Sequence, residues 1–243
     1  MSPTPRLRAL ALAAIVVALP ALGGCNVAVA VKPIFTKADA SAKLVLKPGL
    51  WADVACPPPP AQKPGCRTLE VGRASLSGLF DPKTDHLPPE GAAMFSGPQP
   101  YVIADGDPPV VQVRYPAIGG IIKDGPDMVK PEDKTLPGYV FLGLQPIERD
   151  TEGDIVSLEA WLVLCGPPPP QGAPTTPEAK AFGRYMGITE HPFAGSVRQG
   201  MSCEFDSRAT LHRAAGLSRQ YMAPPMRMRW IAARGPTGRK GSP

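Results

Sequence analysis

The sequence predicts an α+β fold that consists mainly of an antiparallel β-sheet, with two short helices and long proline-rich loops. Two pairs of apolar segments separated by turn residues are typical of β-hairpins. Two further segments begin with residues that cap and start helices. The chain has 33 prolines and 25 glycines among 243 residues, which is typical of long irregular connections. Its hydrophobic content of 43% is enough for an ordered core.

The two predicted hairpins lie in the middle of the chain. Residues 101–104 and 110–115 are separated by the turn-forming sequence Asp105-Gly106-Asp107-Pro108-Pro109. Residues 139–144 and 155–164 form the second pair, with a polar segment between them. Because short connections join antiparallel neighbours, these segments predict a meander.

Other strands are predicted on both sides of the hairpins. Residues 44–46 predict a short strand, and Trp51 follows as a core or edge anchor. Residues 160–164 are apolar without a break, so we expect this part of the sheet to be central and covered on both faces. Residues 226–230 alternate apolar side chains with arginines, which is the pattern of a half-buried strand.

Two helices are predicted in the C-terminal third. One begins at residues 176–178, where a capping threonine precedes proline and glutamate, and ends near Gly187. The second begins near Asp206 or Ser207. Its buried face is expected to carry Leu211, Ala215 and Ser218.

The N-terminus has the features of a secretion signal. Arg6 and Arg8 precede an uncharged apolar stretch, residues 9–24. That stretch leads into Leu22-Gly23-Gly24-Cys25, which resembles the lipobox of bacterial lipoprotein precursors.

The resemblance implies that Cys25 receives diacylglycerol and becomes an acylated N-terminus after removal of the signal peptide, residues 1–24. Several acyl chains on one residue make a stable membrane anchor. Asn26 is not the aspartate that retains such proteins in the inner membrane, so the resemblance implies the outer membrane, facing the periplasm. The alternative is an uncleaved signal anchor, because apolar residues resume at 27–31.

The remaining chain divides into three predicted parts. Residues 25–42 are expected to form the lipidated N-terminus and a tether, residues 43–233 a single periplasmic α+β domain, and residues 234–243 a disordered basic tail. Removal of Arg6 and Arg8 with the signal lowers the net charge from +5 to +3. This excess is too small to indicate nucleic-acid binding.

With Cys25 assigned to lipid, four cysteines remain: Cys56, Cys66, Cys165 and Cys203. An even number in an oxidising compartment predicts two disulfides. Of three possible pairings we favour Cys56 with Cys66 and Cys165 with Cys203, because each pair is local in the chain. A zinc site is disfavoured, because the three histidines, His86, His191 and His212, show no ligand spacing with the cysteines. We therefore expect no metal and no cofactor.

The sequence contains no recognisable catalytic motif of a hydrolase or nucleotide-binding enzyme. The layout is also similar to that of uncharacterised envelope lipoproteins of Gram-negative bacteria, a resemblance that assigns no activity. The leading hypothesis is a non-enzymatic structural or interaction module, with the membrane and an envelope protein as partners. One alternative is a binding domain for a lipid, glycan or peptide, with a site edged by Trp51, Tyr139 and Trp161. The other is an enzyme with a dispersed site around His86 or His191.

Overall fold

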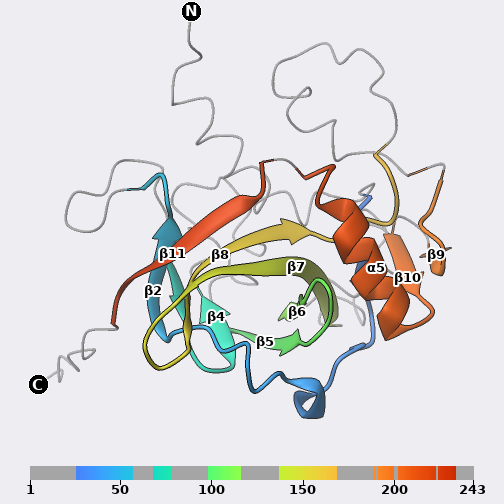
Figure 1. The fold of residues 1–243 in the computed structure, drawn as a ribbon. Helices are drawn as coiled ribbons and strands as arrows, with labels where there is room; N and C mark the ends of the chain where they lie inside the picture. The colour runs from blue at the N-terminus through green and yellow to red at the C-terminus, as the bar shows by residue number, and fades with distance from the viewer. Residues whose placement is uncertain are drawn as a thin grey trace, which may run out of the picture.

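The computed structural model describes residues 26–56, 68–77, 98–115, 137–168, 189, 191–199, 202–222 and 224–233. Within them, eight antiparallel strands form one closed sheet, a barrel, in the order β7-β6-β5-β4-β3-β2-β11-β8, with β8 pairing again with β7 (Figure 1). The barrel strands are β2 (Gly49–Asp53), β3 (Thr68–Val71), β4 (Ser75–Ser77), β5 (Gln99–Ala104), β6 (Val110–Tyr115), β7 (Gly138–Arg149), β8 (Ile155–Leu162) and β11 (Met226–Ala232).

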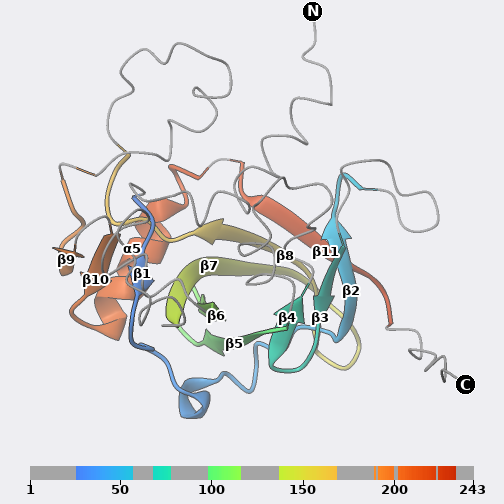
Figure 2. The same ribbon diagram turned by 180° about the vertical axis from the view of Figure 1, so that it is seen from behind.

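Five further short elements lie in the described residues. The strand β1 (Val29–Ala30) extends the sheet by pairing with β7, and the elements outside the wall are the 3-10 turn η1 (Lys37–Asp39), β9 (Ser196–Gln199), β10 (Ser202–Phe205) and the helix α5 (Arg208–Ser218). Strands β9 and β10 pair with each other as a separate sheet. Figure 2 shows β1 and α5 on the same side of the barrel as this small sheet.

The predicted fold class is wrong. The described residues contain one α-helix and one 3-10 turn, and the sheet is closed, so the molecule is mostly antiparallel β rather than α+β with two helices. The predicted C-terminal helix is present as α5, and Ser207 caps it by accepting a hydrogen bond from the Thr210 amide. The other predicted helix, residues 176–187, lies outside the described residues.

Both predicted hairpins are confirmed, as β5–β6 and β7–β8. Strand β8 pairs with β7 on one side and β11 on the other, and residues 158–164 are all buried, as expected for a central strand. The predicted strand at residues 44–46 is instead an isolated parallel bridge from Leu46 to Ile155.

Two hydrophobic cores result from the alternation of side chains along the wall. One fills the barrel interior and includes Trp51, Val113, Leu144, Ile155 and Met228. The other lies between the outer face of the wall and α5, and includes Val110, Phe141, Val163, Leu211 and Ala215. Because one core lies on each side of it, the β7–β8 part of the wall is covered on both faces. Burial in the barrel interior also raises the pKa of the Tyr101 hydroxyl to about 12.

The N-terminal residues correct the predicted domain boundaries. Residues 25–42 were expected to form a tether, but Val27, Ala28, Val29 and Ala30 are buried against the barrel. The folded domain therefore includes residues before 43. The predicted signal peptide, residues 1–24, and the predicted basic tail, residues 234–243, lie outside the described residues.

Candidate functional site

The candidate site is the end of the wall where the chain enters the fold, here called the anchor end: Asn26, residues 164–166 and Thr189. Asn26 is 1% exposed. Its side-chain amide donates to the Gly166 carbonyl oxygen at 2.5 Å, and its own carbonyl accepts from the Cys165 amide at 2.8 Å. The residue directly after Cys25 is thus already held by both side chain and backbone.

Strand β1 completes the wall next to the anchor end. Val29 and Ala30 pair with the start of β7, at Val140 and Tyr139, while Val27 bridges to Leu164 beyond the end of β8. The later part of β7 pairs with β8 itself. Strand β1 therefore fits between the diverging ends of two strands and satisfies backbone groups of both.

The chain then crosses the outside of the barrel as a strap, residues 26–40, which the Gln112 side chain of β6 holds in place. The buried Gln112 side chain accepts hydrogen bonds from the amides of Ile34 and Phe35, at 2.8 and 2.9 Å, and donates to the Phe35 carbonyl at 2.8 Å. Both edges of β6 are already paired, with β5 and with β7, so the strap cannot pair with β6 as a strand. The three side-chain bonds of Gln112 satisfy the strap backbone instead.

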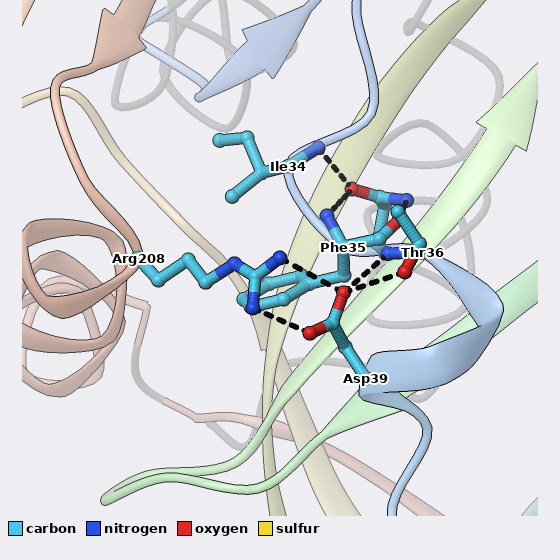
Figure 3. A network of polar contacts seen from close by, with 6 residues as sticks. Ile34, Phe35, Thr36, Asp39 and Arg208 are labelled. Carbon is cyan, nitrogen blue, oxygen red and sulfur yellow. Dashed lines mark hydrogen bonds and ion pairs between the residues drawn. The ribbon is translucent and has the colours of Figure 1, made fainter.

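The far end of the strap is tied to α5 through Asp39. Figure 3 shows its carboxylate between Thr36 and Arg208. The Arg208 guanidinium contacts both carboxylate oxygens, one of them at 2.9 Å, and its carbon lies 5.7 Å from the centre of the Phe35 ring. The Thr36 backbone amide, then its hydroxyl, and then Arg208 hold the pKa of Asp39 below its ordinary value. The strap is therefore fastened along its whole length.

The structure does not bring the three aromatic residues of the predicted binding site onto one face. Trp51 points into the barrel, where it is 1% exposed. Trp161 points outward under α5, and its indole nitrogen donates to the Ala215 carbonyl at 2.7 Å. Tyr139 is partly buried against the outer core. A Cβ atom at Gly143 would overlap the Trp161 ring, so the missing side chain there makes room for the indole.

The disulfide between Cys165 and Cys203 is confirmed. It joins the anchor end to β10, and a cross-link over 38 residues restricts the unfolded chain considerably. Cys56 is also disulfide-bonded. Cys25 and Cys66 lie outside the described residues, so the predicted pairing of Cys56 with Cys66 stays a prediction.

Glu159, which the sequence analysis missed, lies on the outer face of β8 and is 4% exposed. Arg227 donates to it at 2.7 Å and Arg219 at 2.6 Å, and Arg219 also lies over the Trp161 ring at 5.1 Å. The hydrogen bond from Arg227, followed by that from Arg219, holds the pKa of Glu159 below its ordinary value of 4.5, against the effect of desolvation. The sequence feature that could have indicated this ion pair is a single glutamate beside the apolar run 160–164, together with the arginines that alternate with apolar residues at 226–230.

The turn between β7 and β8 gathers the carboxylates of Asp150, Glu152 and Asp154 within 4.8 Å of one another. One Asp150 oxygen accepts from the amides of Glu152 and Asp154, both at 3.0 Å, and the other lies 2.7 Å from the Lys47 ammonium. The Lys47 hydrogen bond is the main reason that the pKa of Asp150 is lowered. These contacts explain the cluster as a closed hairpin turn.

Of the three histidines, two lie in the described residues. Nδ1 of His212 is 2.8 Å from the Pro108 carbonyl oxygen, and the ring packs on Phe35 and beside Gly106. His191 is exposed, and its amide donates to Thr189 at 3.2 Å. His86 lies outside the described residues. His212 therefore serves to join α5 to the β5–β6 turn and the strap.

No helix within the described residues is long and apolar enough to span a bilayer. No protein-family model matches the chain, and no curated protein or solved structure matches it either.

Proposed function

We propose that this chain is a lipid-anchored envelope protein, a non-enzymatic interaction module held by acyl chains on Cys25 at the periplasmic face of the outer membrane. The observation that carries the proposal is the burial of Asn26, the residue that follows the lipobox cysteine. A cut before Cys25 would remove the apolar stretch 9–24 and leave the strap and the barrel intact. The proposed cleavage site therefore leaves only Cys25 ahead of Asn26, the first described residue of the fold.

The chemistry of the described ionisable groups favours an interaction role over catalysis. Glu159, Asp39 and Asp150 are each paired with arginine or lysine, and each has a lowered pKa. A carboxylate that is ionised and paired in this way is a poor general base at neutral pH. His212 is committed to a backbone carbonyl.

The anchor is tested with the full-length chain carrying Cys25→Ala, expressed in a Gram-negative host. We expect wild-type protein to incorporate acyl label and to sediment with outer membranes, and the variant to lose both properties, because the anchoring methylenes are gone. The matched control is Lys37→Ala, an exposed residue of the strap. Wild-type protein without acyl label, or a Cys25→Ala variant that still sediments with membranes, would overturn the anchor.

The interaction role is tested separately, by photo-crosslinking of the acylated chain in intact envelopes. The probes are placed at the exposed apolar residues Val54, Ile147, Val197 and Leu217. We expect at least one position to give a discrete adduct with another envelope protein, because exposed apolar side chains favour contact surfaces. The absence of any protein adduct at all four positions would overturn the interaction role.

A further inference from the structure

We infer that the anchor end docks directly on the lipid surface, so that the barrel has one fixed orientation on the membrane. This inference rests on the proposed lipidation of Cys25. The occupant of the surface is a bilayer, identified by the position of the attachment residue. His191, which is exposed and lies two residues after Thr189, would then face the lipid headgroups, with Asn26, Gly166 and Thr189 buried beneath this end, and the turn between β7 and β8 would face away.

The first step of the argument is the absence of slack between anchor and fold. Consecutive Cα atoms are 3.8 Å apart, so Cys25 is held within one residue of Asn26. Asn26 is fixed by its side chain on Gly166 and by its carbonyl on Cys165, and the Ala28 amide donates to Val163 at 2.8 Å. A flexible tether over residues 26–42 would instead let the domain wander by about 23 Å on average.

The second step is the stiffness of the anchor end itself. The disulfide from Cys165 joins this end to Cys203 of β10. The Phe193 amide donates to the Cys165 carbonyl at 2.8 Å, which fixes the segment that contains His191. A side chain at Gly166 would overlap the His191 carbonyl and approach the Thr189 hydroxyl to 2.7 Å, so these residues are packed closely. Movement of Asn26 relative to the barrel would therefore have to break several contacts.

The third step identifies the end that faces away from the bilayer. Strand β8 begins after the acidic turn at residues 150–154 and runs toward the anchor end, and the stretch from residue 155 to residue 164, which continues two residues past the strand, spans about 30 Å. Figures 1 and 2 both show the β7–β8 turn on the side of the barrel opposite β1. The carboxylates of Asp150, Glu152 and Asp154 would thus be kept away from anionic lipid, which would repel them.

The test uses the acylated full-length chain in vesicles of phosphatidylethanolamine and phosphatidylglycerol in equal amounts, with a quencher on the lipid headgroups. A fluorescent amino acid replaces either His191, at the anchor end, or Glu152, in the acidic turn; both residues are exposed. We expect quenching at position 191 to exceed that at position 152 several-fold. Equal quenching at the two positions would overturn the fixed orientation.

The matched control inserts about ten glycine and serine residues between Cys25 and Asn26, which adds about 17 Å of average reach. We expect the difference between the two positions to fall toward zero, with membrane attachment unchanged. A difference that persists with the insertion would show that the anchor position does not set the orientation, and would overturn the inference. Mass analysis of Cys25 separates the two proposals: an acylated chain with equal quenching contradicts only the orientation, and a chain without acyl groups contradicts the anchor itself.

Discussion

At the scale of single residues, Asn26 is held in the wall by both its side chain and its backbone. The side-chain nitrogen Nδ2 donates to the Gly166 carbonyl oxygen. The side-chain oxygen Oδ1, unlike the backbone carbonyl oxygen, has no hydrogen-bond partner within the described residues. In sequences that resemble lipoprotein precursors, the residue after the cysteine is also the one associated with sorting between membranes. A substitution made to change sorting would therefore also change the stability of the wall.

We predict that Asn26→Asp destabilises the domain by about 1–3 kcal/mol at neutral pH, because the donor to Gly166 is lost and a buried carboxylate faces a carbonyl oxygen. The measurement is urea unfolding of the purified protein, with Lys37→Ala as the control, expected within about 0.5 kcal/mol of wild type. The loss should shrink in acid, where a protonated carboxyl can donate again. An unchanged unfolding midpoint at neutral pH would contradict this account of Asn26.

At the scale of elements, one side chain of the barrel makes three of the hydrogen bonds that hold the strap. Gln112 is the only described residue that bonds to the strap backbone at both Ile34 and Phe35. Most residues of β6 are apolar, and a glutamine that is only 3% exposed is unusual among them. The polar residue is explained by its partners, which are backbone groups that would otherwise be buried without bonds.

We predict that Gln112→Leu, which keeps the approximate volume of the side chain, releases the strap locally. Three backbone groups of the strap lose their hydrogen-bond partner, which lowers the free energy needed to detach the strap locally from the barrel. A decrease of about 1.4 kcal/mol makes the detached state tenfold more populated. Trypsin cleavage at Lys37 should therefore be roughly tenfold faster or more, with lower amide protection at Phe35. Equal cleavage rates in the variant and the wild type would mean that the strap is held by its other contacts.

At the scale of the whole molecule, Glu159 couples β8 to two segments that follow it by 60 and 68 residues. It lies on β8, Arg227 lies on β11, and Arg219 follows α5. Because its folded-state pKa is lowered, its contribution to stability is fully present above the unfolded value near 4.5 and is lost as the pH falls through the folded value.

We predict that acid destabilises the wild type more steeply than Glu159→Gln between pH 5 and the pH at which Glu159 becomes protonated. The measurement is the free energy of unfolding in urea at a series of pH values from neutral to acid. The two proteins should differ most at neutral pH, where the variant leaves two arginines without their carboxylate, and should converge in acid. A difference that is the same at every pH would contradict the role of the ionised pair.

The sequence was sufficient for the parts of the fold that are local. The β5–β6 and β7–β8 hairpins and α5 each have their determinants within one short stretch, such as the cap at Ser207. Closure of the sheet was not predictable in this way, because β11 pairs with β2, and their residues are far apart in the chain. An alternating pattern at residues 226–230 specifies a strand face and does not specify its neighbours.

The candidate site was predictable only in its position along the chain. The resemblance of residues 22–25 to a lipobox marks Cys25, but the apolar residues at 27–31 by themselves predict a tether or the rest of a signal anchor. The segment is too short for its period to separate a strand from an apolar helix. Its partner residues, Tyr139 and Val140, carry no mark in the sequence that identifies them as such.

The position of β1 also has a consequence in time. Val29 pairs with Val140, about 110 residues further along the chain. A ribosome that adds roughly 5–20 residues per second makes these two residues about 5–20 s apart. Strand β1 is therefore made well before the strand that it pairs with, and its backbone groups stay without their β7 partners during that interval.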